Sequence, residues 1–330
     1  MPWRGPRPDN PGEFPTLGGV VGKWIETWCR IPDGEFGGQP YKLTDEMWIF
    51  LAHHYRLKLD AQEGQLSTAF HYRRSILIRP QKWGKSPLTA AIICAEAAGP
   101  VQFAGWSESG EPLGREIATP RIQVTASSED QTANVYGHLL PMIQRGPLAD
   151  VIPDAGVTRT NLPNGGWIEP VTSKARSRLG QPITFAIQDE TGMWTRPNGG
   201  QSLADTQRRG LAGMSGRSIE TSNAWDPAES SVAQTGFESS ARDIYRDYRV
   251  PPAHLSYRNK VERRKIHRFA YGHSWWVDLD AIEAEAIELL ERDPAQAERF
   301  FGNRVVHGLG AWLPEGLWEG AWAGALAATA

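Results

Sequence analysis

The stretch Ser75-Ile76-Leu77-Ile78-Arg79-Pro80-Gln81-Lys82-Trp83-Gly84-Lys85-Ser86 decides how this sequence folds. Its first four residues are rich in β-branched and apolar side chains and predict a buried strand. The apolar pattern from about residue 85 to 98 predicts a helix directly after the loop. A strand, a loop that ends in Gly-Lys-Ser and a following helix are together typical of a loop that binds phosphate groups.

Each residue at the end of this loop suits a phosphate ligand. Gly84 lets the backbone approach the anion, Lys85 can bridge the β- and γ-phosphates, and the Ser86 hydroxyl can ligate Mg²⁺. The helix N-terminus adds free N–H groups and the positive end of its dipole. Arg79 stands where the usual motif has its first glycine, so the match is degenerate. A helix start with a surface lysine is therefore the alternative interpretation.

A pair of acidic residues follows an apolar strand predicted over residues 183–187. In parallel sheets ligands bind at the carboxyl ends of the strands, where Asp189 and Glu190 stand. We expect Asp189 to hold the Mg²⁺ shell, through water, and Glu190 to polarise an attacking water molecule. A solvated strand end is the alternative.

A third group of polar residues, Thr221-Ser222-Asn223, ends the strand predicted over 218–222. Its hydroxyl and amide groups could sense the γ-phosphate and transmit its loss to neighbouring segments. An ordinary cap between a strand and a loop is the alternative here.

The remaining pattern alternates strands with helices. Further elements are expected as a strand at 122–126, a helix at 129–144, a hairpin around Asn164-Gly165-Gly166 and a helix at 202–211. This alternation predicts a parallel sheet covered on both faces.

The two ends of the chain show other patterns. Residues 1–20, rich in Pro and Gly, predict an extended arm, and Thr44 is a candidate helix N-cap. Towards the C-terminus we expect helix over 230–248, a break at Pro251-Pro252, and a helix pair over 280–301 in which Asp293 caps the second member.

Composition limits the possible classes of protein. The net charge of the 330 residues is −3, so contact with DNA would have to come from local patches or from several subunits together. The basic clusters Arg73-Arg74, Arg208-Arg209 and 258–265 are expected to be solvated surface. The two cysteines form no CxxC pair, which excludes a zinc site built on thiolates and favours a reducing, cytosolic setting. No signal peptide and no apolar run of transmembrane length is seen, so no membrane partner is expected.

At these motifs the sequence resembles the ATPase domain of tailed-phage terminase large subunits. In that family the first glycine of the phosphate loop is commonly replaced, and basic or Gln residues fill the loop, as in Arg79–Ser86 here. The resemblance implies that ATP and Mg²⁺ are bound by residues of this loop together with Asn223 and Asp189. The loop residues concerned are Arg79, Gln81, Lys82, Trp83, Gly84, Lys85 and Ser86, with Mg²⁺ at Ser86 and Asp189.

The same resemblance assigns catalytic roles. Glu190 and Lys85 are the expected catalytic residues of the subunit itself, and Arg178 is expected to reach the nucleotide of the adjacent subunit, with Arg176 behind it. The family often reads adenine with a Gln in the N-terminal segment, where this sequence has Met47. The motor would form a homo-oligomeric ring, expected to be a pentamer, in the host cytoplasm and transiently at the procapsid. Its expected partners are double-stranded DNA, the portal protein and the small terminase subunit.

The resemblance also implies a domain plan with an α/β fold of the P-loop NTPase (ASCE/RecA-like) class. We expect an N-terminal arm at 1–40, the ATPase domain at 41–250, a helical lid or linker at 251–315 and a tail at 316–330. Residues 299–314 are similar to the family's connector into a nuclease domain, and DNA cutting by this chain is not expected. A helicase-like P-loop ATPase and a non-catalytic nucleotide-binding or DNA-binding module are the competing functions.

Overall fold

The computed structural model describes residues 3–7, 12–126, 129–172 and 181–308. Its centre is an eight-stranded sheet with the order β10-β1-β9-β8-β4-β7-β6-β5. The six strands from β10 to β7 are parallel, and β6 and β5 continue the sheet antiparallel. The strands are β1 (Arg74–Ile78), β4 (Arg121–Ala126), β5 (Asp154–Ala155), β6 (Thr160–Asn161), β7 (Trp167–Thr172), β8 (Phe185–Gln188), β9 (Arg217–Ser222) and β10 (Ile244–Tyr248), with a separate hairpin of β2 (Gln102–Trp106) and β3 (Pro112–Arg115).

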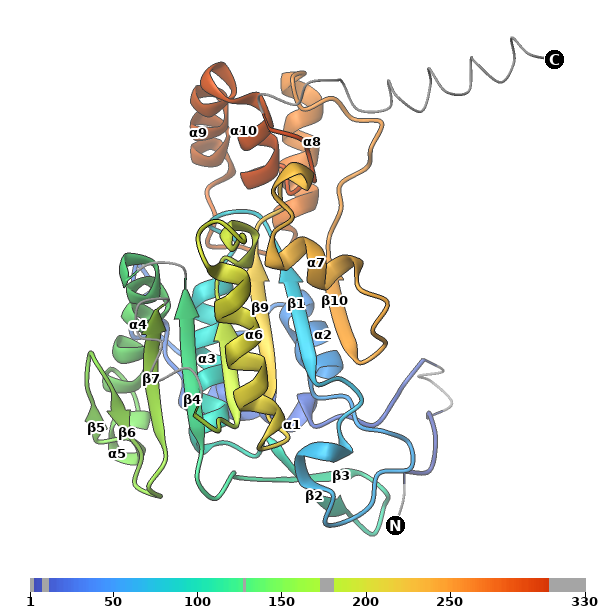
Figure 1. Cartoon of the computed structure of the whole chain (residues 1–330), viewed down its shortest axis with the longest axis vertical. Coiled ribbons are helices and arrows are strands. Elements are labelled where there is room, and N and C mark those ends of the chain that lie inside the picture. The colour runs from blue at the N-terminus through green and yellow to red at the C-terminus, as the bar shows by residue number, and fades with distance from the viewer. Residues whose placement is uncertain (1–2, 8–11, 127–128, 173–180, 309–330) are drawn as a thin grey trace, which may run out of the picture.

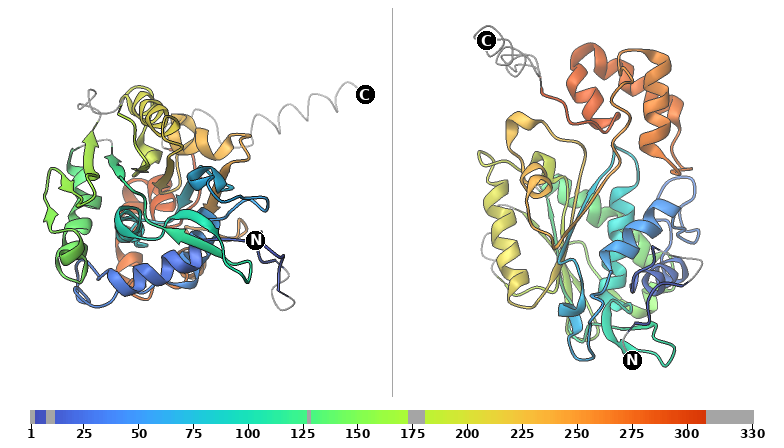
Figure 2. Two further views of the ribbon diagram at one scale, coloured as in Figure 1. Left: turned by 90° about the horizontal axis from the view of Figure 1, so that it is seen from below. Right: turned by 90° about the vertical axis from the view of Figure 1, so that its right-hand side faces the viewer.

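Helices cover both faces of this sheet (Figure 1, Figure 2). One face is covered by α2 (Asp45–His54), α3 (Lys85–Ala98) and α4 (Glu129–Gln144), and the other by α6 (Gly200–Ala212) and α7 (Val232–Glu238). The helix α1 (Gly18–Trp28) packs against α2 and α3, and the single turn α5 (Leu148–Val151) contacts α4. The layered arrangement predicted from the alternating pattern is thus confirmed.

A helical unit lies beyond the carboxyl ends of the central strands (Figure 1). It consists of α8 (Lys260–Tyr271), α9 (Leu279–Arg292) and α10 (Pro294–Phe300). Asp293 accepts a hydrogen bond from the backbone N–H of Gln296 and so caps α10, as the sequence predicts. Among the described residues no helix has the length and apolar character that crossing a membrane requires.

Buried polar pairs help to hold the central strands together. All six residues of β9 are buried, although five of them are polar: Arg217, Ser218, Glu220, Thr221 and Ser222. Arg217 donates to the carboxylate of Glu96 on α3 (3.0 Å) and to the backbone oxygen of His54. Because an unpaired buried charge is costly, these partners are what allow polar residues into the middle of the sheet.

One sequence prediction of local structure is wrong. The helix expected over 230–248 ends at Glu238, and residues 244–248 form β10, which pairs parallel with β1. The region assigned to an N-terminal arm, residues 1–40, includes the packed helix α1, whose Val21 and Ile25 are fully buried. Pairing with a strand some 170 residues away stabilises β10, and no local pattern carries that information. The expected tail and the end of the connector, from residue 309 on, lie outside the described residues.

Candidate nucleotide site

The loop between β1 and α3 has the backbone shape that a phosphate loop requires. Lys82 (φ +67°) and Gly84 (φ +104°) both lie in the left-handed region, and Gly84 is the residue directly before α3. A Cβ atom on Gly84 would lie 2.8 Å from the ring of Trp276, so only glycine fits at this position. The first N–H groups of α3 therefore open onto the loop, as anion binding at a helix N-terminus needs.

The ammonium of Lys85 points into the middle of this loop. Its Nζ donates to the backbone oxygens of Arg79 and Pro80 (3.0 Å each) and to Oδ1 of Asn223 (2.8 Å). Burial lowers the pKa of Lys85 to about 8, while the negative charges of Asp189 and Glu190 act in the opposite direction. A buried ammonium held only by neutral oxygens is well placed to bind an anion.

Asp189 directly follows β8, which is separated from β1 by β9. Asp189 is 3% exposed and accepts a hydrogen bond from the hydroxyl of Thr221. Burial raises the pKa of Asp189 to about 6, and the Thr221 hydrogen bond opposes this rise. Glu190 follows in the left-handed region (φ +55°), an uncommon conformation for a residue with a side chain. Such backbone strain occurs often at functional sites.

The three polar residues at the end of β9 each contact a different part of the site. Thr221 donates to Asp189, the Ser222 hydroxyl accepts from the backbone N–H of Gly192 (2.9 Å), and Asn223 accepts from Lys85. Because β9 lies between β1 and β8, its end bridges the phosphate loop and the acidic pair. The residues Thr221, Ser222 and Asn223 therefore lie between the phosphate loop and the acidic pair.

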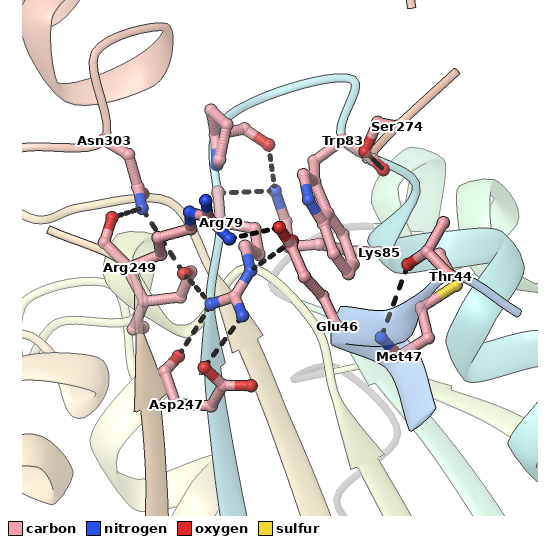
Figure 3. Close-up of polar contacts among 12 residues, drawn as sticks. Thr44, Glu46, Met47, Arg79, Trp83, Lys85, Asp247, Arg249, Ser274 and Asn303 are labelled. Carbon is pink, nitrogen blue, oxygen red and sulfur yellow. Dashed lines mark hydrogen bonds and ion pairs between the residues drawn. The ribbon is translucent and has the colours of Figure 1, made fainter. Parts of the chain in front are cut away.

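The side chain of Arg79 points away from the loop, contrary to its predicted role in nucleotide binding (Figure 3). Arg79 is 3% exposed and donates to the Asp247 carboxylate of β10 at 2.8 Å, with Glu46 of α2 at 3.9 Å. Arg249 forms a second ion pair with Glu46. These contacts fix α2, β1 and β10 to one another, so Arg79 serves the fold and only its backbone oxygen faces Lys85.

The backbone of the loop is attached to the helical unit. The N–H of Gln81 donates to the Phe300 oxygen (2.7 Å), and the hydroxyl of Tyr271 donates to the Gln81 oxygen (2.8 Å). The Ser274 hydroxyl donates to the backbone oxygen of Trp83 (3.3 Å). The Trp83 side chain itself is 1% exposed, so it packs in the core and does not face a ligand. Lys82 is exposed.

Two cavities adjoin the loop and the acidic pair. The larger, about 270 Å³, is bordered by Gly84 and Pro87 and by aromatic side chains of Phe36, Tyr41 and Trp276. The smaller, about 70 Å³, lies beside Glu190 and Asn223 and is closed by α10 through Gln296 and Arg299. Met47, the position where the family would read adenine, is 1% exposed and lines neither cavity.

The chain is similar in sequence and in fold to proteins of phages. The chain is 26% identical over 344 residues to the Gene 13 protein of Mycobacterium phage D29 and 27% identical over 346 residues to that of Mycobacterium phage L5. The crystal structure of the HK97 bacteriophage large terminase matches with a TM-score of 0.65 at 20% identity. The fold of this chain is therefore similar to that of a phage large terminase. Each match covers 92% of this chain but only 58% of the other protein, and no protein-family model matches.

The terminase-like fold confirms the predicted α/β class of P-loop NTPases. At this level of identity the match concerns the fold alone, and the roles of individual residues rest on the geometry described above. Arg178 and Arg176 lie outside the described residues, so their predicted trans-acting role stays a prediction. The chain spans 58% of the length of the relatives it matches.

Sequence reasoning missed the residues that other segments bring to this candidate site. Phe36 and Tyr41 precede the phosphate loop by some forty residues, and Trp276 and Arg299 follow it by about two hundred. The adjacent pair Trp275-Trp276 was an available signal of a ligand-binding surface, because tryptophans outside the core often line binding sites. Trp275 is indeed 55% exposed.

The oxygen donors present also fit a magnesium ion. Ser86 is the second residue of α3, directly after Lys85, and the buried Asp189 directly follows β8. A hydroxyl and one or two carboxylates, completed by water and phosphate oxygens, are the usual protein share of a nucleotide-bound Mg²⁺. No cluster of three or more His, Cys, Asp or Glu exists among the described residues, and a nucleotide-bound Mg²⁺ does not require one.

Proposed function

We propose that this chain hydrolyses ATP and uses the energy to move double-stranded DNA, as the ATPase part of a packaging motor. The observation that carries the proposal is the convergence of Lys85, Asp189 and Asn223 at one edge of the sheet, with Glu190 beside them. A surface lysine at a helix start, the competing interpretation, does not explain a buried ammonium that donates to Asn223 and is influenced by the charges of Asp189 and Glu190.

Phosphate binding begins with the lysine. When a triphosphate enters the loop, Lys85 exchanges the oxygens of Arg79 and Pro80 for phosphate oxygens, and the helix N-terminus supplies N–H donors. We place the Mg²⁺ ligands at Ser86 and, through water, at Asp189. The ion would neutralise charge on the β- and γ-phosphates.

Hydrolysis then requires a base for water. Glu190 borders the small cavity beside Asn223 and is only partly buried, so it can face both solvent and the terminal phosphate. We assign Glu190 to orient and polarise the attacking water. Asn223, bonded to Lys85, would detect the terminal phosphate and its loss.

The nucleoside fits the aromatic cavity beside the loop. Its volume of about 270 Å³ and its position next to Gly84 and Pro87 suit a purine attached to phosphates in the loop. Trp276, packed over Gly84, would contact the base or the ribose. Met47, which stands where the family often has its adenine-reading Gln, is buried in the core.

In a ring of subunits, an arginine from one subunit would complete the nucleotide site of the next. Arg178 would enter the neighbouring subunit's site and stabilise charge in the transition state, an effect worth orders of magnitude in rate. The ring, expected to be a pentamer, would work with the portal protein and the small terminase subunit.

An ATPase assay that detects released phosphate over a range of protein concentrations, with and without double-stranded DNA, tests the proposal. We expect turnover per chain to rise with concentration and with DNA, and the concentration dependence to vanish in Arg178→Ala. Absence of turnover at every concentration, with ATP still bound, would favour a non-catalytic nucleotide-binding module. Strand separation of a short duplex would favour a helicase.

A further inference from the structure

A second large cavity lies at the opposite end of the sheet, where β1 and β9 begin. Its volume is about 340 Å³, and the residues around it come from the segments 58–74 and 208–218 together with Asp243. Arg74 is the first residue of β1, whereas the phosphate loop follows the last. The five residue steps from Arg74 to Arg79, the first residue of the loop, span ~17 Å at about 3.3 Å per residue. The cavity is therefore distinct from the candidate nucleotide site.

Positive charge dominates the lining of this cavity, which we call the basic pocket. One acidic residue, Asp243, lines it together with five basic ones: Lys58, Arg73, Arg74, Arg208 and Arg217. The sequence prediction was that Arg73-Arg74 and Arg208-Arg209 are solvated surface. Arg74 departs from it, because this residue is only 8% exposed.

The ion pairs of the basic pocket leave positive charge unbalanced. Arg74 and Arg208 share a single oxygen of the buried Glu220, at 3.2 and 2.7 Å. The further partner of Arg208, Asp205, is exposed and lies at 3.7 Å, where water weakens the attraction. Lys58 donates to the Thr68 backbone oxygen (2.8 Å) and has no carboxylate partner among the described residues.

The other two cations of the pocket are paired. Arg217 pairs with Glu96 at 3.0 Å, and Arg73 pairs with Asp243 at the rim. The excess positive charge therefore sits at Lys58 and at the pair Arg74 and Arg208, all of which line the pocket.

Two buried donors in the pocket wall are also unused. The Nε atoms of Arg74 and Arg208 are both shielded from solvent and have no hydrogen-bond partner within the described part of the chain. Burial lowers the pKa of Arg74, Glu220 opposes that shift, and the charges of Arg208 and Arg73 lower the pKa further. A buried guanidinium with a free donor, beside two like charges, gains both a hydrogen bond and charge neutralisation from an anion.

We propose that the basic pocket binds phosphate groups, supplied either by a DNA backbone or by free phosphate. Guanidinium groups bind phosphate oxygens through paired, charge-assisted hydrogen bonds, and Arg208 and Arg74 lie together with such donors. Lys58 and Arg73 at the rim, the latter with 61% of its side chain exposed, would meet the ligand first. The inference goes beyond the motor function and does not depend on it, because binding can be measured without ATP.

The first experiment measures thermal stabilisation of the whole chain by inorganic phosphate, with sodium chloride at equal ionic strength as the reference. Phosphate also fits the loop at Lys85, so the measurement is made in Lys85→Ala as well as in the unaltered chain. We expect the phosphate-dependent rise in Tm to persist in Lys85→Ala. We expect it to be lost when Arg208→Gln, or the double change Lys58→Gln/Arg73→Gln at exposed positions that leave folding intact, is added to Lys85→Ala.

The second experiment identifies the source of the phosphate. Binding of a fluorescein-labelled 30-base-pair duplex is followed by anisotropy between 50 and 200 mM salt, without nucleotide. If the DNA backbone is the ligand, each removed contact lowers the slope of log affinity against log salt by about 0.9. The matched control Arg264→Gln/Lys265→Gln removes two exposed charges from α8 and should leave affinity and slope unchanged.

The outcomes separate cleanly. Loss of phosphate stabilisation together with weaker DNA binding in the pocket variants supports the proposal with DNA as the source. Loss of phosphate stabilisation with unchanged DNA binding supports it with free phosphate as the source. A phosphate-dependent rise in Tm that survives both sets of pocket substitutions in the Lys85→Ala background, or that disappears in Lys85→Ala alone, overturns it. None of these results depends on ATP hydrolysis, which the phosphate-release assay measures independently.

Discussion

Replacing Lys85 by Met should change how the stability of the protein depends on pH. Burial lowers the pKa of Lys85 from its ordinary 10.5 to about 8. Between these two values the folded chain carries a neutral amine, while the unfolded chain binds a proton. Unfolding then takes up a proton, so the free energy of unfolding rises with pH through this window and falls as pH drops through about 8.

The linkage relation gives the size of the effect. With a folded pKa of about 8 and an unfolded pKa of 10.5, the unaltered chain gains about 2 kcal/mol of stability between pH 7 and pH 9.5 from this group alone. Lys85→Met lacks the titrating group and should lack this gain. The substitution also leaves three oxygens without a donor. That loss is independent of pH, so it shifts the whole curve without changing its slope.

Urea unfolding followed by tryptophan fluorescence, at pH 7, 8, 9 and 9.5, measures both curves. Lys82→Met is the matched control, because Lys82 belongs to the same loop but is exposed. We expect the control to follow the unaltered chain and the free-energy difference between Lys85→Met and the unaltered chain to change by about 2 kcal/mol across the range. A constant difference from pH 7 to 9.5 would show that the ammonium is solvated, and the reasoning about the site would fail.

Three further substitutions test the proposed hydrolysis. Glu190→Gln should keep ATP binding, measured with a fluorescent analogue, and lower the turnover number by at least about a hundredfold; retained turnover would remove Glu190 from its role. Thr221→Val deletes a hydrogen bond that lowers the pKa of Asp189, so that pKa should rise above about 6 and the acid limb of the kcat/KM profile should move to higher pH; an unmoved limb contradicts the assignment. Trp276→Ala opens the aromatic cavity, and should weaken ATP binding about tenfold or more while leaving pyrophosphate binding unchanged; equal weakening of both would place Trp276 over the phosphates alone.

The elements that carry the motifs could be predicted because they are locally consistent. The strand before the loop, the helix after it and the acidic pair at a strand end follow from apolar periodicity and from the positions of Gly84 and Asp189. The sheet order brings β9 between β1 and β8, and the polar residues after β9 therefore meet the other two. Here the pattern of side chains and the rule that ligands bind at carboxyl strand ends were sufficient.

What escaped prediction depends on contacts between distant segments. Arg79 was expected to face the nucleotide because its position in the motif suggested so, but Asp247, 168 residues later, holds its side chain. The strand containing Asp247 was itself expected to be helical, since its identity as a strand comes from pairing with β1. The aromatic cavity is likewise assembled from residues 31–42 and 275–276, which no local pattern connects.

The attachment of the loop to the helical unit gives the site a mechanical consequence. Lys85 donates to the backbone oxygens of Arg79 and Pro80, and an entering phosphate must compete for those bonds. The next residue, Gln81, is held at its N–H by α10 and at its oxygen by the last residue of α8. Adjustment of the loop to phosphate therefore acts directly on both helices through short, well-aligned hydrogen bonds. Because α10 also closes the cavity beside Glu190, the water-activating side of the site and the phosphate-binding side are joined to the same helix. A change at either side has to be accommodated by α10.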